Sequence, residues 1–421
     1  MRTDRSSSIL LSSLLLLSLL VPLLVSVAIT SVGTVGAGSG ENWVVVSYSP
    51  NIYNHGVAVV GAKENIYIAN SNTDGSSNVF MRYNTVTGVW TTKTPPQWFK
   101  NGTCFAWDNG NYIYSLFGGA YTDSNPRHWF YRYSISGDNW QKLENTPGVN
   151  QGAGDAITWV PGSALSDNEN NYIFALVGNK DNGPSFWRYK ISSDNWVSRA
   201  SPPGRTDDGC SLVWTGGTYL YALRGEYLET SPCYDFWRYD IVNNTWQTRE
   251  NIPAYPHDGG SGGVGDGGSL LWISGWHSDY IYALSGNQCY PETPEPIWDN
   301  RFYRYSISTD NWVRLADLPK GVGDQNGPRL GFASENIYCW RGTYNDPPNG
   351  GENDKVLWAY TVKNEGSPTC PVLISPENNT STSDNTPTFV WTRGSDADNH
   401  KIEIDNDSNF SSPIDNVVVA S

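Results

Sequence analysis

One phrase recurs five times along the chain, and its spacing restricts the fold more than any other feature. Each copy begins with Phe-X-Arg-Tyr and ends in a tryptophan seven residues after the tyrosine, as in "FWRYDIVNNTW" at residues 236–246. The closing tryptophans are Trp90, Trp140, Trp196, Trp246 and Trp312. A period of about 50 residues excludes most helical solenoids and predicts a four-stranded propeller blade as the repeating unit.

Each repeat predicts four strands. The fourth repeat shows them well, with a first strand at 210–214, a second at 219–225, a third within "FWRYDI" and a fourth opening at Trp246. Short polar turns such as "NN" and "SDN" precede the tryptophans and suit tight hairpins. The 42 glycines, 25 prolines and 19 tryptophans of the chain fit many short strands joined by turns better than helices.

The second-strand pattern occurs six times, although the full phrase occurs five times. The sixth copy, at 336–342, is followed by a third strand at 356–362 but by no tryptophan strand. The stretch "NWVVVSYSPNIY" at 42–53 resembles "NWVRLADLPKGV" at 311–322, with Trp43 in the place of Trp312. The sequence therefore predicts an all-β fold, a six-bladed β-propeller over residues 41–366 that is closed by an N-terminal strand.

These repeats resemble kelch repeats, as found in kelch proteins and in the galactose-oxidase propeller. The resemblance rests on the Tyr-to-Trp spacing, on aliphatic second strands that end in glycine, and on a proline shortly after the tryptophan. The chain departs from the kelch pattern at the double glycine after the second strand, which only the second repeat carries, as Gly118-Gly119. The resemblance implies a propeller used for binding, or for enzymatic chemistry as in the oxidase.

Both ends of the chain predict different structures. Residues 1–37 contain two arginines, a long apolar run and small residues near Ala37, a pattern typical of a secretory signal peptide. The run is also long enough for an uncleaved membrane anchor. Residues 371–421 resemble the opening strands of immunoglobulin-like or fibronectin type III-like modules, and about 50 residues amount to a truncated β-sandwich. Either reading of the N-terminus predicts a secreted or cell-surface protein.

The cysteines and the charge narrow the chemistry further. Six cysteines are scattered without a CxxC pair, and Cys233 and Cys289 fall on neighbouring loops, where we expect a disulfide. The formal net charge of −15 leaves no basic stripe for nucleic acid. The repeated arginine of the phrase is expected to pack on aromatic rings rather than to bind ligands.

The longest loops predict where a ligand would bind. In an up-and-down blade, the loop between the second and third strands and the loop into the next blade emerge on the same face, here called the long-loop face. Its aromatic, acidic and basic residues suit a sugar, whose CH faces stack on rings while its hydroxyls donate to acids. The candidate ligand-binding residues are Trp98, His128, Trp129, Arg205, Asp207, Asp208, Tyr227, His257, Asp258, Tyr290, Trp298, Asp324, Arg329 and Tyr344.

The sequence leaves three functions open. We expect an extracellular binding or adhesion module for a glycan or a protein, with no required cofactor. The alternatives are a propeller enzyme acting on extracellular glycans, as a hydrolase, lyase or copper oxidase, and a structural component of the cell envelope. Asp-rich loops also offer oxygen ligands for calcium, although no EF-hand spacing is present.

Overall fold

The structure, a computed structural model, divides the chain into two compact units, residues 37–362 and residues 1–36 with 363–421. It describes residues 7–9, 42–50, 55–71, 78–96, 99, 102–117, 129–147, 155–167, 170–178, 185–206, 209–225, 234–253, 255–257, 260–265, 267–275, 277–286, 300–319, 329–340, 356–362, 372–375, 389–392, 399–404 and 415–420. Side chains are described within 42–50 and within 58–362, apart from 255–257 and 260–262.

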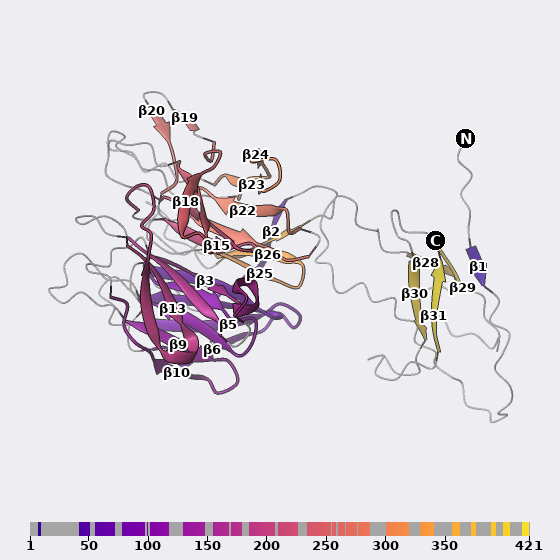
Figure 1. Ribbon diagram of the computed structural model, residues 1–421. Helices are drawn as coiled ribbons and strands as arrows, with labels where there is room; N and C mark the ends of the chain where they lie inside the picture. Colours follow the sequence, from indigo (N-terminus) through magenta and orange to yellow (C-terminus); the bar gives the residue numbers. More distant parts are fainter. Residues whose placement is uncertain are drawn as a thin grey trace, which may run out of the picture. The chain divides into compact units, whose positions relative to one another are not determined.

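The larger unit is a six-bladed β-propeller. Its described residues form six four-stranded antiparallel sheets (Figure 1). The first three sheets consist of β3 (His55–Ala62), β4 (Asn65–Ser71), β5 (Asn78–Asn84) and β6 (Trp90–Lys93); β7 (Cys104–Trp107), β8 (Tyr112–Leu116), β9 (Phe130–Ser134) and β10 (Asn139–Lys142); and β11 (Ala156–Val160), β12 (Tyr172–Val177), β13 (Ser185–Lys190) and β14 (Asn195–Arg199).

The fourth and fifth sheets follow the same order, and the last sheet draws its fourth strand from the N-terminal side. They consist of β15 (Ser211–Trp214), β16 (Tyr219–Leu223), β17 (Phe236–Asp240) and β18 (Thr245–Thr248); β21 (Ser269–Trp272), β22 (Tyr280–Leu284), β23 (Phe302–Ser306) and β24 (Asn311–Arg314); and β25 (Leu330–Ala333), β26 (Asn336–Trp340), β27 (Val356–Thr361) and β2 (Trp43–Tyr48). Short 3-10 helices η1 (Gly162–Leu165) and η2 (Ile191–Ser193) and a ribbon of β19 (Tyr255–His257) and β20 (Gly260–Gly262) complete the unit.

The first strands of the sheets form a closed ring. Each contacts the first strand of the next sheet, and β25 contacts β3. The backbones approach closely at this last contact, because a Cβ on Gly61 would lie 1.9 Å from the carbonyl oxygen of Phe332. Only glycine leaves room for two backbones at that distance. Buried apolar side chains then fill the space between neighbouring sheets, as Leu116 of β8 and Ile157 of β11 do.

In the last sheet, β2 pairs antiparallel with β27, and Trp43 lies opposite Tyr360. In Figure 1 the indigo β2 lies among the orange strands of this sheet. The Trp43 ring is buried against Phe302 and Tyr360, with ring centroids 5.0 and 5.4 Å away. Its indole Nε1 donates to the carbonyl oxygen of Ala316 at 3.1 Å, which ties the sixth sheet to the fifth.

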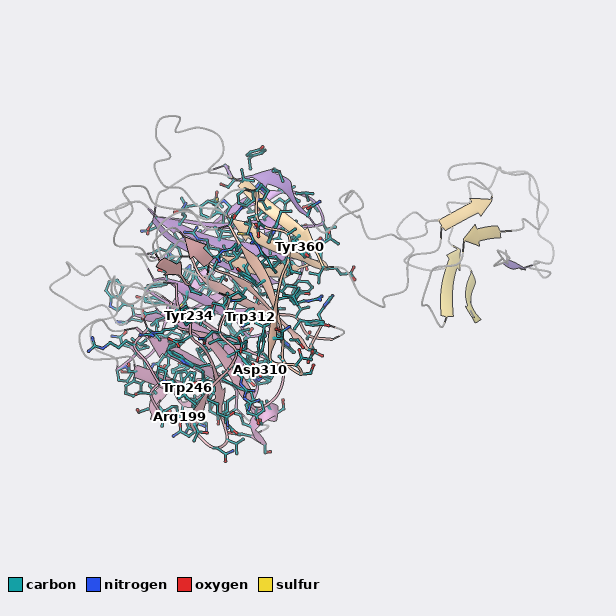
Figure 2. All side chains as sticks on the ribbon, turned by 90° about the horizontal axis from the view of Figure 1, so that it is seen from above. Arg199, Tyr234, Trp246, Asp310, Trp312 and Tyr360 are labelled. Atoms are coloured by element: carbon teal, nitrogen blue, oxygen red, sulfur yellow. The ribbon has the colours of Figure 1, made fainter. Side chains whose placement is uncertain are left out.

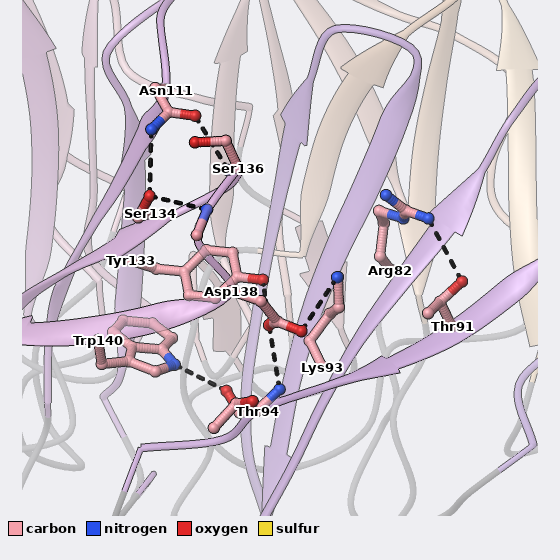
Figure 3. A network of polar contacts seen from close by, with 11 residues as sticks. Arg82, Thr91, Lys93, Thr94, Asn111, Tyr133, Ser134, Ser136, Asp138 and Trp140 are labelled. Atoms are coloured by element: carbon pink, nitrogen blue, oxygen red, sulfur yellow. Dashed lines mark hydrogen bonds and ion pairs between the residues drawn. The ribbon is translucent and has the colours of Figure 1, made fainter.

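The repeated phrase acts as a clamp on the preceding sheet. In the second sheet, the Tyr133 hydroxyl donates to Asp138 at 2.6 Å, and the same carboxylate accepts a hydrogen bond from the backbone N–H of Thr94 (Figure 3). The indole Nε1 of Trp140 donates to the carbonyl oxygen of Thr94 at 2.9 Å. The backbone N–H and the carbonyl oxygen of Thr94, which follows the first sheet, are therefore both hydrogen-bonded by the repeated phrase of the second sheet.

The clamp recurs at the next three boundaries. The clamped residues are Glu144, Ala200 and Glu250, whose N–H groups donate to Asp194, Asn244 and Asp310 and whose carbonyl oxygens accept from Trp196, Trp246 and Trp312. The Asp or Asn has a positive φ of 48° to 56°, a conformation that these two residue types tolerate. Figure 2 labels Trp246, Asp310 and Trp312 on the ring.

The boundary between the sixth and first sheets uses a different acceptor. Gly88 occupies the position of Asp138, so the carboxylate of the clamp is replaced by a residue with no side chain. The Trp90 Nε1 donates to the Ser47 hydroxyl of β2 at 2.8 Å, next to a bulge between Val45 and Ser47. Ser47 follows Trp43 by the same four residues that separate Thr94 from Trp90.

The repeated arginine stacks on a tyrosine of its own sheet, as expected from the sequence. Arg132 lies over Tyr112 at 4.6 Å and Arg238 over Tyr219 at 4.3 Å. Arg188 on Tyr172 and Arg304 on Tyr280 repeat this contact. The conserved spacing of these arginines within the repeats therefore has a structural cause.

The described residues of the smaller unit form one three-stranded sheet and one pair of strands. A three-stranded sheet has the order β1 (Ser7–Ile9), β29 (Phe389–Thr392) and β28 (Val372–Ser375), and β30 (Asn399–Ile404) pairs with β31 (Asp415–Ala420). Within the described residues, no helix has the length and hydropathy needed to cross a membrane.

The clamp carboxylates predict a specific dependence of stability on pH. Burial opposes ionisation of Asp138, but hydrogen bonds from the Tyr133 hydroxyl and from the preceding sheet outweigh it, so the pKa of this carboxyl is lowered. Burial likewise opposes ionisation of Asp310, and hydrogen bonds from Tyr305 and the Glu250 amide lower its pKa overall. A carboxyl with a lowered folded-state pKa stabilises the fold above its unfolded pKa of about 4, and this contribution is lost as the pH falls through the folded value.

We expect the free energy of unfolding to fall with pH below about 4, and to fall less steeply in Asp138→Asn/Asp310→Asn. Asparagine keeps the acceptor oxygen, as Asn244 does in the fourth sheet, but cannot be protonated in this range. Asn244→Asp is the matched control, and its stability should fall more steeply than that of the wild type. Urea titrations across the acid range measure all three, and identical slopes would contradict the assignment.

Candidate functional site

The long-loop face is where the six sheets cease to be alike. Antiparallel order places the start of each first strand and the end of each second strand at this face. Inside the second strands, the sequence aromatic, small residue, leucine repeats in four sheets. The residues that follow these leucines are Phe117, Val177, Arg224 and Ser285. Side-chain chemistry therefore varies from sheet to sheet at the rim of a constant frame, as expected of a binding surface.

Two buried charged residues lie at the start of first strands on this face. Asp155 immediately precedes β11 and is 2% exposed, and Arg329 immediately precedes β25 and is 1% exposed. These strands belong to the third and sixth sheets, which are opposite one another in the order of the ring. The Oδ1 of Asp155 accepts a hydrogen bond from the N–H of Gly178 at 3.2 Å. Charges of opposite sign thus occupy opposite sides of the ring at this face.

Each of these two charges lies near a buried cysteine and affects the pKa of its thiol. Burial raises the pKa of Cys104 well above its usual value, and the nearby Asp155 carboxylate raises it further. Burial also raises the pKa of Cys339, to about 12, although the Arg329 guanidinium acts in the opposite direction. Both thiols are free and stay protonated at neutral pH, so neither has the thiolate character of a nucleophile.

A half-buried ion pair lies on the same face in the fourth sheet. Arg224 follows β16, and its guanidinium Nη1 lies 2.5 Å from the Asp235 carboxylate just before β17. The Arg224 Nε also donates to the carbonyl oxygen of Arg205 at 2.9 Å, which attaches the loop entering this sheet. Gly204 packs beside the Trp237 ring, so an aromatic plane lies next to the guanidinium. The guanidinium and the carboxylate can hydrogen-bond the hydroxyls of a ligand, whereas the Trp237 ring itself is buried.

Three of the candidate residues named from the sequence have described side chains. Trp129 is half-buried and accepts a backbone hydrogen bond from Phe117, Arg205 is exposed, and Arg329 is buried. Trp129 immediately precedes β9, Arg205 lies between β14 and β15, and Arg329 immediately precedes β25. His257 is described in backbone only, within β19. The remaining candidates lie outside the described residues: Trp98, His128, Asp207, Asp208, Tyr227, Asp258, Tyr290, Trp298, Asp324 and Tyr344.

The sequence also predicted a disulfide on this face and left calcium binding open. Cys233 and Cys289, expected to form a disulfide, also lie outside the described residues. In the part of the chain that the structure describes, no three His, Cys, Asp or Glu side chains gather in a way that could hold a metal ion. No protein-family model matches the chain, and no curated protein matches it.

Sequence reasoning missed several polar residues at this face. Asp155, Arg224 and Asp235 are not among the candidates from the longest loops, because these residues flank the strands. Asn70 was overlooked for the same reason, and it is buried at the end of β4. The available signal was departure from the repeat, because Asn70 and Arg224 stand where other sheets carry Val177 or Phe117.

Thiol reactivity distinguishes the buried cysteines from the expected disulfide. We expect Cys104 and Cys339 to resist alkylation in the folded protein near pH 8 and to react fully in denaturant, because both are buried with raised pKa values. Peptide mass mapping without reductant measures this. The same spectra should contain a linked peptide pair for Cys233 and Cys289. Alkylation of Cys104 in the folded state would contradict the burial, and free Cys233 and Cys289 would contradict the disulfide.

Proposed function

We propose that the protein is an extracellular binding module, a kelch-like propeller that engages a glycan or a protein on its long-loop face. The observation that carries the proposal is the contrast between a repeated frame and a variable rim. The clamps and the Arg-on-Tyr contacts recur from sheet to sheet. The rim instead carries different polar residues, namely Asp155, Arg224 with Asp235, and Arg329. A rigid frame that presents diverse polar side chains is suited to recognition.

The chemistry of the rim favours a glycan among these ligands. Sugars are recognised by aromatic planes together with charged and amide groups that hydrogen-bond their hydroxyls. The fourth sheet offers the charged groups in Arg224 and Asp235, and the half-buried Trp129 of the second sheet offers an aromatic ring at the same face. The proposal includes secretion or surface attachment through residues 1–37, and an immunoglobulin-like or fibronectin type III-like module over residues 371–421. The pairs β28 with β29 and β30 with β31 support the latter.

A glycan array tests this function. We expect the full chain to bind a defined subset of glycans, and Arg224→Met and Asp155→Asn to lower that binding about tenfold or more, because each removes a charged hydrogen-bonding group. Val242→Thr changes an exposed residue of a hairpin away from this face and is the matched control. Arrays with and without calcium separate a calcium-dependent mode. Absence of glycan binding would overturn the glycan ligand and favour a structural role.

We also propose that β2 is the element that closes the ring in solution. The support is its ladder with β27, the burial of Trp43, and the hydrogen bonds of Trp43 to Ala316 and of Trp90 to Ser47. These contacts with the fifth sheet, with β27 and with the first sheet support the proposal.

Deleting residues 41–50 tests the closure. We expect the deletion to cost at least about 3 to 5 kcal/mol, the usual cost of removing a buried tryptophan, and to broaden or abolish the cooperative melting transition. Truncation after residue 366 is the control, because it removes only residues outside the propeller unit. Calorimetry of both variants measures the effect, and unchanged melting of the deletion would contradict the closure.

A further inference from the structure

The boundary between the sixth and first sheets differs from the equivalent boundaries at three positions. The register of the ladders makes Arg329 equivalent to Cys104, Ala156, Ser211 and Ser269, all small residues. It makes Trp340 equivalent to Leu116, Leu176, Leu223 and Leu284. Asn70 is equivalent to Phe117, Val177, Arg224 and Ser285. We call the set Asn70, Arg329 and Trp340 the closure seam.

The three residues of the closure seam come from three strands but face one boundary. Leu330 pairs with Cys339, so Arg329 and Trp340 are opposite one another and lie on the same face of the sixth sheet. Trp340 packs in the buried cluster that contains Ile66 and Ile68 of β4. Asn70 is on the same face of β4 as those isoleucines, because side chains alternate along a strand.

The closure seam contains polar atoms that the protein itself does not satisfy. The amide nitrogen and oxygen of Asn70 and the indole Nε1 of Trp340 are buried without a hydrogen-bond partner. Asn70 is 1% exposed and Trp340 is 0% exposed. An unsatisfied buried polar group destabilises the fold, and native proteins pair nearly all such groups. At the boundary between the second and third sheets the equivalent residues are Cys104, Leu116 and Val177, and the side chains of Leu116 and Val177 have no polar atom.

The hydrogen-bond donors of the closure seam indicate which kind of chemical group could bind there. Arg329 supplies a guanidinium, Trp340 an indole N–H, and Asn70 an amide NH₂ together with one acceptor oxygen. Three donor groups, one of them cationic, match a carboxylate, and the acceptor oxygen matches an adjacent hydroxyl. A site rich in N–H donors is unusual in a chain of net charge −15, where acids are otherwise in excess.

We propose that the closure seam binds the carboxylate of an acidic sugar, so that the glycan recognised on the long-loop face carries a uronate group. This inference rests on the proposed glycan binding and names its ligand class. Asn70 is the penultimate residue of β4, and Arg329 immediately precedes β25. Both therefore lie at the long-loop end of their sheets. A bound uronate would pair the Trp340 N–H and the Asn70 amide.

D-Glucuronate and D-glucose are a matched pair of probes, because they differ only in a carboxylate against a CH₂OH group. We expect the full chain to bind glucuronate about tenfold or more tightly than glucose, because a hydrogen bond to a charged group is worth about 1.5 to 3 kcal/mol. NMR titration of each sugar measures the affinity. Trp340→Phe, which removes the N–H and keeps a ring, and Asn70→Val, which copies Val177, should each weaken glucuronate binding about tenfold and leave glucose binding unchanged.

Controls separate this inference from the proposed function. Trp272→Phe removes an indole N–H from β21, one that is bound to the Ser278 carbonyl, and should leave glucuronate binding intact. Arg329→Met should abolish the preference for glucuronate, and if it does not fold, Trp340→Phe and Asn70→Val decide. Equal affinity for the two sugars, or wild-type glucuronate binding in both seam variants, would overturn the inference. If neutral glycans still bind and respond to Arg224→Met, the proposed function survives; if no glycan binds, both proposals fail.

Discussion

The fold depends on a hydrogen-bonded clamp between neighbouring sheets, in which one phrase holds both backbone polar groups of a single residue. At the boundary of the first and second sheets, Asp138 accepts from the N–H of Thr94 and Trp140 donates to its carbonyl oxygen. Outer strands are the edges of these small sheets, where unpaired backbone groups would otherwise face solvent or other chains. The clamp satisfies such groups and sets the spacing of the sheets at the same time, which explains why the phrase recurs in nearly the same words.

The clamp also explains where the ring departs from its own rule. Gly88 and Ser47 stand at the boundary between the sixth and first sheets, where the Trp90 indole donates to a hydroxyl instead of a carbonyl. This boundary joins segments from the two ends of the propeller unit. The same boundary carries the close backbone approach of Gly61 to Phe332 and the unsatisfied polar atoms of Asn70 and Trp340. Several departures from the repeat therefore occur together where the two ends of the propeller unit meet.

The strands and their order could be predicted from residue patterns along the chain. The contacts that these residues make with neighbouring sheets could not. Strand β15 spans Ser211–Trp214, close to the expected 210–214, because local periodicity and turn residues set strand limits. The expected stacking of Arg238 is present on Tyr219 of its own sheet. The spacing of Asp310 and Trp312, however, contained no sign that both bind Glu250, about 60 residues earlier. For the candidate site, the long loops named Arg329 but not Asp155, which immediately precedes β11.

By itself the sequence determined the repeating unit, the number of units, and which residue types recur at each position, because these are properties of neighbours along the chain. Only the tertiary structure decided which residues meet across a boundary between sheets. Asn70 and Trp340 are about 270 positions apart, and they face one boundary because the first strands form a closed ring. Contacts between such distant residues depend on loop closure and packing, which local sequence patterns do not predict.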